Sequence, residues 1–252
     1  MKLSGNTIFI TGGGSGIGRG LAEALYKLGN KVIISGRRRA NLDEVVAANP
    51  GIEAIELDII DPASIDAAAA RLIAGHPDLN VLINNAGIMP FDDAAAAIDN
   101  EQAQAIIATN LLGPIRITSA LVEHLKAQPS ATIIHNTSVV AYTPIAQTAV
   151  YSASKAGLHS YALSQRFMLR DTSVRVQEIV PPWVNTDLVR KTDDPRAMPI
   201  DDFIAQLMEQ LSTDEPELVV EASRQMRDNP GPNEHALVQQ LNEFLVANPI
   251  PV

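Results

Sequence analysis

The feature that most constrains the fold of this chain is an alternation of short β-branched runs with longer segments of helical periodicity. Continuously apolar runs such as residues 7–10 and 31–35 are typical of strands that are buried on both faces of a parallel sheet. Residues 17–28 instead repeat apolar side chains at three- and four-residue steps, which marks one face of a helix. Strands and helices that alternate in this way predict an α/β fold, a three-layer doubly wound parallel sheet of the Rossmann type.

The same patterns give the limits of the expected elements. Strands are expected at residues 7–10, 31–35, 52–57, 81–83, 132–134 and 174–180, with a further short one at 217–220. Helices are expected at residues 17–28, 41–48, from 61 onward, 101–111, 114–126, 150–170 and 203–211, and the stretch 221–252 is expected to be helical and polar. Because 252 residues without a repeat or linker suit one core, we expect a single domain over residues 1–252.

A glycine-rich segment lies between the first expected strand and the first expected helix. It reads Thr-Gly-Gly-Gly-Ser-Gly-Ile-Gly at residues 11–18. Backbone N–H groups at the start of a helix, together with the positive end of its dipole, suit a pyrophosphate. The spacing is T-G-x-x-x-G-x-G rather than G-x-G-x-x-G, but it occupies the place where dinucleotide-binding folds carry their phosphate loop. The segment therefore indicates a dinucleotide site, with an ordinary glycine-rich turn as the alternative.

Three consecutive arginines follow the second expected strand. At this place an acidic residue binds a free ribose 2′-hydroxyl, whereas arginine accommodates a 2′-phosphate. No carboxylate occupies the turn, and Arg37, Arg38 and Arg39 come directly after Gly36. We expect Arg37, and next Arg38, to bind the phosphate, and Arg39 to be a solvated residue that opens a helix. The sequence thus favours NADP(H) over NAD(H) as cofactor.

Tyr151 and Lys155 lie four residues apart in the long expected helix, so they share one of its faces. An unperturbed phenol has a pKa of about 10, which is too high for efficient proton transfer at neutral pH. An ammonium group held nearby favours the phenolate and lowers that pKa. Ser138 follows the fifth expected strand, where its hydroxyl could hydrogen-bond a substrate oxygen. The Tyr-x-x-x-Lys spacing is common on amphipathic helices, so it becomes informative only together with the other motifs.

Five features occur in one order along the chain: the glycine segment, Asn84-Asn85-Ala86-Gly87 after the fourth expected strand, Asn110, Ser138 and the Tyr151/Lys155 pair. Over residues 3 to about 188 this combination resembles the short-chain dehydrogenase/reductase family. The resemblance implies an oxidoreductase that transfers a hydride between a nicotinamide cofactor and a ketone, an aldehyde or a secondary alcohol.

The resemblance also implies a role for each catalytic residue. Tyr151 would be the general acid in carbonyl reduction and the base in alcohol oxidation. Lys155 would lower the pKa of Tyr151 and hold the nicotinamide ribose, Ser138 would orient the carbonyl, and Asn110 would position a water that links Lys155 to a proton relay. The implied cofactor contacts, besides Tyr151 and Lys155, are Gly12, Ser15, Ile17, Gly18, Asp58, Ile59, Asn85, Ala86, Gly87, Pro181, Val184 and Thr186.

Two departures from the family pattern concern the last third of the chain. After the sixth expected strand the family usually carries Pro-Gly, whereas here Pro182 replaces the glycine and stiffens the turn. This variant looks like the DltE-type subgroup. The usual Asp-Gly-Gly signature of the C-terminal strand is also absent, so a homodimer is as much expected as the homotetramer.

Charge and composition exclude several other classes of protein. The net charge is −10, which disfavours nucleic acid and anionic membranes as partners. The absence of cysteine removes disulfides, thiolate metal sites and cysteine nucleophiles, and it is compatible with the cytoplasm, where we expect the protein to act. No uninterrupted run approaches the roughly 18 apolar residues of a membrane helix. The five histidines show no metal-ligand spacing, so no metal site is expected.

The substrate is expected to be a small or medium hydrophobic ketone or aldehyde, because no arginine or lysine is obviously placed for an acidic one. Met89, Tyr142 and Trp183 lie near the expected strand ends and could form an apolar wall, although ordinary packing is the simpler interpretation. A substrate lid is expected at about residues 188–215. The alternative function is that of a catalytically silent, dinucleotide-binding regulatory protein, which the intact set of catalytic motif residues disfavours.

Overall fold

The computed structural model describes residues 1–228 and 231–250. Within them the chain forms a seven-stranded parallel sheet in the order β3-β2-β1-β4-β5-β6-β7. The strands are β1 (Thr7–Thr11), β2 (Lys31–Gly36), β3 (Glu53–Glu56), β4 (Leu79–Asn84), β5 (Ala131–Asn136), β6 (Val174–Ile179) and β7 (Glu217–Leu218). The helices are α1 (Gly16–Lys27), α2 (Arg39–Ala48), α3 (Pro62–Gly75), α4 (Asn100–Ile107), α5 (Gly113–Lys126), α6 (Ala149–Leu169), α7 (Ile200–Leu211), α8 (Arg224–Arg227) and α9 (Glu234–Ala247).

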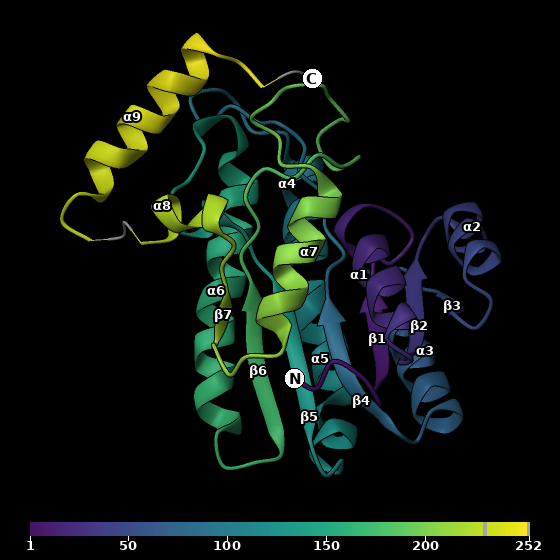
Figure 1. The fold of residues 1–252 in the computed structure, drawn as a ribbon. Coiled ribbons are helices and arrows are strands. Elements are labelled where there is room, and N and C mark those ends of the chain that lie inside the picture. Colours follow the sequence, from purple (N-terminus) through teal and green to yellow (C-terminus); the bar gives the residue numbers. More distant parts are fainter. Residues whose placement is uncertain (229–230, 251–252) are drawn as a thin grey trace.

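Helices cover both faces of the sheet and confirm the three-layer Rossmann-type architecture (Figure 1). On one face α1, α2 and α7 bury apolar residues such as Leu21, Leu42 and Phe203. On the other face α3, α5 and α6 contribute a second cluster that includes Leu72 and Leu121. Strand order reverses beside β1, which pairs with β2 on one side and β4 on the other. Ligands in such sheets bind beyond the carboxyl ends of the strands at this reversal.

One helical region differs from the sequence expectation of two separate helices at 101–111 and 114–126. A π-helical turn, Ala108–Leu112, joins α4 to α5 without a break. Pro114 has no N–H to donate to the preceding turn, and a wider turn there accommodates that loss without ending the helix. Close packing adds a second constraint, since a Cβ on Gly113 would lie 2.6 Å from Cγ1 of Ile59.

The joined helix Asn100–Lys126 is long and apolar enough on average to cross a membrane, with a mean hydropathy of 1.5 over its best window. The sequence contains no uninterrupted apolar run of this length, because polar residues are scattered through the segment. The high mean hydropathy of the joined helix was therefore not expected. In the fold 44% of that window is buried, and Ile117, Leu121 and Leu125 pack in the core.

The C-terminal region is less regular than expected. The seventh strand ends at Leu218 rather than at residue 220, and the Ser223 N–H donates to the Val220 carbonyl in the turn that follows. The expected helical stretch 221–252 divides into a 3₁₀ turn (Glu221–Ser223), α8 and α9, with residues 229–230 and 251–252 outside the described part. α9 lies at one end of the molecule, away from the sheet (Figure 1). The other elements begin and end within three residues of their expected limits.

Candidate active site

The glycine-rich loop between β1 and α1 is held against the turn that follows β4. Gly12 has a φ of +67°, and a Cβ there would lie 2.9 Å from the Ala86 Cα. A Cβ on Gly18 would lie 2.3 Å from Nδ2 of Asn85, so neither glycine can carry a side chain. Thr11 Oγ1 accepts the Asn85 and Ala86 N–H groups at 3.0 and 3.1 Å. Two segments of the expected cofactor site, more than 70 residues apart, therefore form one rigid unit.

Three expected cofactor residues lie beyond β6, and one of them, Thr186, reaches the glycine loop. The carbonyl of Pro181 accepts the Val139 N–H at 3.0 Å, which ties the turn after β6 to that after β5. Val184 and Thr186 are both buried. A Cβ on Gly16 would lie 3.4 Å from the Thr186 Cβ, so the Thr186 side chain reaches the start of α1.

Two other expected cofactor contacts, Asp58 and Ile59, are less closely joined to the loop. The N–H of Asp58 binds Ser64 Oγ at 3.0 Å within its own turn. The Ile59 side chain points toward the backbone of Gly113 and belongs to the core cluster on that face of the sheet. Ile17 is half-buried and packs against the core cluster on the opposite face.

The three arginines after β2 have different surroundings, although all are exposed. Arg39 Nε forms an ion pair with Asp43 Oδ1 at 2.8 Å, one turn along α2. Arg38 Nη2 lies 3.4 Å from Ser15 Oγ, at the mouth of the glycine loop. Arg37 precedes it at the end of β2. The pair Arg37 and Arg38 is therefore available to an anion beside the loop, whereas Arg39 is engaged by its own helix.

Tyr151 and Lys155 lie in the first two turns of α6 and are almost fully buried, with 5% and 4% of their surface exposed. Lys155 Nζ donates to the Asn136 carbonyl at 2.7 Å and lies 5.6 Å from the centroid of the Tyr151 ring. Ser138 begins a 3₁₀ turn after β5, and its hydroxyl is hydrogen-bonded to Tyr151. The structure thus brings together three of the four expected catalytic side chains in one buried group.

Burial dominates the acid–base properties of this group. It raises the pKa of Tyr151 to about 12, and the hydrogen bond with Ser138 acts in the opposite direction. Burial also lowers the pKa of Lys155 to about 8. The pKa of Tyr151 is thus raised, whereas the spacing to Lys155 predicted that it would be lowered, because burial depends on tertiary packing and not on spacing along the helix. A phenol that holds its proton suits the acid role in carbonyl reduction.

Asn110 is fully buried in the π-helical turn, and its amide holds the segment after β4. Its Oδ1 accepts the Ile88 N–H, and its Nδ2 donates to the Ile88 carbonyl, both at 2.9 Å. Nδ2 also lies 3.2 Å from Ser154 Oγ on α6. A Cβ on Gly87 would lie 3.4 Å from Asn110 Oδ1 and 3.9 Å from Lys155 Nζ, so Gly87 separates two of the side chains expected to be catalytic.

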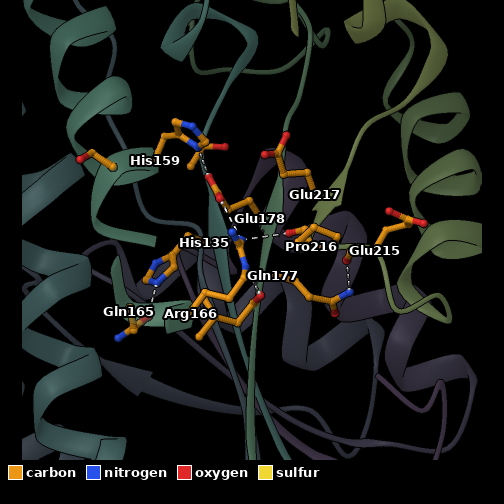
Figure 2. Close-up of polar contacts among 12 residues, drawn as sticks. His135, His159, Gln165, Arg166, Gln177, Glu178, Glu215, Pro216 and Glu217 are labelled. Atoms are coloured by element: carbon orange, nitrogen blue, oxygen red, sulfur yellow. Dashed lines mark hydrogen bonds and ion pairs between the residues drawn. The ribbon is translucent and has the colours of Figure 1, made fainter. Parts of the chain in front are cut away.

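A buried charged network lies further along α6 and was not expected from the sequence. Glu178 on β6 has none of its side-chain surface exposed, and it binds two basic side chains from α6. Arg166 Nη2 lies 3.0 Å from Oε1, and His159 Nδ1 lies 2.8 Å from Oε2. Figure 2 shows these side chains pointing toward one another from the helix and the strand. The Glu178 hydrogen bond raises the pKa of His159, which favours its charged form.

Glu217 on β7 extends this network toward Tyr142, which follows Ser138 by four residues. Oε2 of Glu217 accepts a hydrogen bond from the Tyr142 hydroxyl at 3.0 Å and one from Arg227 Nε at 2.7 Å. One ligand atom each from His159, Glu178 and Glu217 lies within 4.8 Å of the others, a spacing that could hold a metal ion. The guanidinium groups of Arg166 and Arg227 already neutralise both carboxylates, so the geometry favours an ion-pair network. The signal in the sequence was a lone carboxylate, Glu178, in an otherwise buried strand.

Apolar side chains surround Tyr151. Val140 and Tyr142 belong to the same buried cluster, and Met89 packs against it. The ring of Trp183, the third residue expected in this wall, lies under the guanidinium of Arg196, with Cζ 5.6 Å from the ring centroid. Tyr142 and Met89, the other two expected wall residues, thus lie with Tyr151.

Comparison with known proteins agrees with this geometry. Residues 6–197 match the family model described as short chain dehydrogenase. The chain is 36% identical to the uncharacterized oxidoreductase DltE of Bacillus subtilis (strain 168), over 96% of this chain and 98% of that protein. It is 31% identical to the 3-oxoacyl-[acyl-carrier-protein] reductase FabG of Salmonella typhimurium, over 78% of this chain and 81% of that protein.

A solved structure covers nearly all of both chains. A short chain dehydrogenase from Burkholderia cenocepacia J2315, in complex with NADP, superposes with a TM-score of 0.83 at 26% identity, over 98% of this chain and 99% of that one. The likeness therefore includes the C-terminal region as well as the motif-bearing part. The chain belongs to the short-chain dehydrogenase/reductase family, in its DltE-like subgroup, and is an oxidoreductase that acts on CH–OH groups with NAD(P).

Proposed function

We propose that this enzyme is an NADP(H)-dependent carbonyl reductase, or alcohol dehydrogenase in the reverse direction, in which Tyr151 is the general acid and base. The observation that carries this proposal is the hydrogen-bonded pair of Ser138 and Tyr151, buried beside Lys155 at the carboxyl edge of the sheet. When bound, the nicotinamide supplies or accepts the hydride. Ser138 orients the substrate oxygen, and the Tyr151 hydroxyl delivers a proton to it during reduction.

The residues around the glycine loop fit the phosphates of such a cofactor. The loop would present backbone N–H groups to the phosphates at the start of α1, where residues 14–17 are only half-buried. Lys155, Gly87, Asn85 and Ala86 would contact the nicotinamide ribose, and Pro181, Val184 and Thr186 would also contact the cofactor. The remaining contacts that we assign to the cofactor are Gly12, Ser15, Ile17, Gly18, Asp58 and Ile59.

The preference for NADP(H) over NAD(H) is assigned to Arg37 and Arg38. Both are exposed beside the loop, and no carboxylate replaces them at the end of β2. Guanidinium groups bind a 2′-phosphate with charge-assisted hydrogen bonds. The NADP complex of the Burkholderia cenocepacia relative supports the same preference.

The proposed substrate is a small or medium apolar ketone or aldehyde. Support comes from the side chains that pack around Tyr151, among which Val140, Ile88 and Met89 carry no charge. Residues 188–215 would form the lid, and movement would be confined to 188–199 because Phe203 and Leu207 of α7 are fixed in the core. Exposed Leu163 and Phe167 on α6 suit a subunit contact, in a homodimer or homotetramer. A cytoplasmic site of action is also part of the proposal.

NADPH oxidation by the purified protein tests this function. Butanal, benzaldehyde, acetophenone and ethyl acetoacetate serve as uncharged probes, and pyruvate and glyoxylate as anionic ones. We expect turnover with several uncharged probes and much weaker turnover with both anions. A protein that binds NADPH but oxidises it with none of the six would instead be a dinucleotide-binding regulator.

A further inference from the structure

The helix that carries Tyr151 and Lys155 begins without a cap from its own sequence. Thr148 stands at the N-cap position of α6, and its side chain makes no capping hydrogen bond. Two other helices differ in this respect, because Asp61 and Asp99 cap α3 and α4 from the position directly before each helix. The first N–H groups of any helix need a partner from outside its own ladder.

A distant carboxylate supplies that partner. Asp92 Oδ1 accepts the Ala149 N–H and Asp92 Oδ2 accepts the Val150 N–H, both at 2.8 Å. The N–H of Asp92 in turn donates to the Gln147 carbonyl at 2.9 Å. Three hydrogen bonds thus join residues that are more than 50 positions apart, and both oxygens of one carboxylate are used at the positive end of a helix.

The segment that carries Asp92 is itself fixed by Asn110, which the sequence motifs place among the expected catalytic residues. The Asn110 amide binds both the N–H and the carbonyl of Ile88, four residues before Asp92. Gln102 on α4 donates to the Phe91 carbonyl at 2.9 Å, which places the residue next to Asp92 as well. Residues 88–92 therefore form a short brace between the π-helical turn and the start of α6.

Tyr151 is the third residue of α6, directly after the two amides that Asp92 holds. A displacement of this first turn moves the phenol relative to Ser138, which stands on a different element. Errors of about 1 Å in the placement of a reacting group can reduce a rate by roughly 100-fold. We propose that Asp92 is a positioning residue for catalysis, which holds the Tyr151-bearing end of α6 in register with Asn110 and Ser138.

This role is more specific than general stabilisation of a helix. Because Tyr151 is the proton donor only under the proposed function, the inference rests on that function. A carboxylate that only stabilised the fold would affect turnover, cofactor binding and thermal stability together. A positioning residue changes kcat while the glycine loop and the arginines still bind NADPH.

Asp92→Ala and Asp92→Asn test this inference, with Asp93→Ala as the matched control. Asp93 is adjacent and exposed, and its carboxylate binds only the nearby Ala95 N–H among the described contacts. Assays use NADPH and the best uncharged probe of the panel, well below the melting temperature. We expect Asp92→Ala to lower kcat by about 10- to 100-fold, with NADPH Kd within about twofold of wild type. Asp92→Asn retains one acceptor oxygen, so its kcat should lie between that of Asp92→Ala and that of the wild type.

Hydrogen exchange provides a readout that needs no substrate. The Ala149 and Val150 amides should exchange faster in Asp92→Asn than in Asp93→Ala. The inference is overturned if both Asp92 variants keep kcat within about twofold of Asp93→Ala, or if kcat and NADPH affinity fall by the same factor. If the wild-type protein reduces none of the probes, the proposed function fails, and unchanged exchange at the two amides would separately reject Asp92 as the group that holds the helix.

Discussion

The two halves of the sheet differ in how they hold the side chains expected to be functional. At the ends of β1 and β2, the expected phosphate site consists of the backbone of a glycine loop and of exposed Arg37 and Arg38. At the ends of β5 and β6, Tyr151 and Lys155 are buried, and their helix is further tied to β6 through the buried carboxylate of Glu178. One region presents charged side chains at the surface, and the other holds them in the interior.

The difference follows from what each region has to do. A phosphate is attracted over several ångströms and accepts hydrogen bonds from many directions, so long exposed side chains can adjust to it. Proton transfer instead requires a donor within hydrogen-bond distance of one particular atom. We therefore expect substitutions in the buried region to affect kcat or stability, and those at the arginines to affect cofactor affinity.

The largest effect is expected for Tyr151→Phe, which removes the proton donor from the buried region. The kcat for carbonyl reduction should fall by roughly 1,000-fold, within the usual range for loss of a general acid. NADPH should still bind, as measured by the change in its fluorescence. Tyr161→Phe on the same helix is the control and should retain activity. Substantial reduction by Tyr151→Phe would reject Tyr151 as the acid.

The next effect concerns the charged network rather than the reacting groups. Glu178→Gln leaves the Arg166 guanidinium and the His159 imidazole without their buried carboxylate, which should lower the free energy of unfolding by about 3 kcal/mol. Urea unfolding measures this loss. Glu221→Gln is the control, because Glu221 pairs with Arg224 at the exposed surface and should change stability by less than about 0.5 kcal/mol. Equal changes in the two variants would mean that the buried network adds nothing.

A smaller effect, and one of a different kind, is expected at the arginines. Arg37→Ala should weaken NADPH binding by about 10- to 100-fold, the amount expected for a hydrogen bond to a charged group, and should leave NADH binding nearly unchanged. The ratio of the two dissociation constants is the measured quantity. Arg39→Ala should leave that ratio as in wild type, because Arg39 is paired with Asp43. Equal losses for both cofactors would remove the basis for NADP(H) preference.

The smallest effect is expected in the pH dependence of the free energy of unfolding, to which two histidines contribute. These are His159 on α6 and His135 on β5. The Glu178 hydrogen bond raises the pKa of His159, so its contribution is complete below the unfolded value of 6.5 and is lost as pH rises through the folded pKa. Burial lowers the pKa of His135 to about 4, so its contribution is present above 6.5 and is lost as pH falls toward 4. Urea unfolding of His159→Gln should therefore show a smaller loss of stability than wild type between neutral and alkaline pH. An unchanged slope would contradict the assigned ion pair.

The fold and most of the catalytic group could be predicted from the sequence because their signals are local. The four-residue spacing of Tyr151 and Lys155 already places both side chains on one helical face. The glycine segment gives its position through the strand before it and the helix after it. Parallel strands then bring the residues at their carboxyl ends to a common edge, so chain order was enough to predict that these motifs meet.

The features that could not be predicted depend on contacts between distant segments. Asp92 has the appearance of an ordinary loop residue, and its partners at the start of α6 come 57 and 58 residues later. Glu178 stands out as a carboxylate in a buried strand, but its partners come from α6 and cannot be chosen from spacing alone. Pro114 predicted the start of a new helix. In the structure the π-helical turn accommodates a residue without an N–H group, and the helix continues through it.

That wide turn also changes the phase of the helix. An α-helix advances about 100° per residue, so one additional residue in a turn rotates everything after it by about that angle. Apolar residues before and after Ala108–Leu112 therefore need not follow a single stripe. Ile106 can face the cluster around Tyr151 while Ile117 and Leu121 face the sheet. Deleting one residue from this turn would restore a regular helix and direct one of these two faces away from its partners.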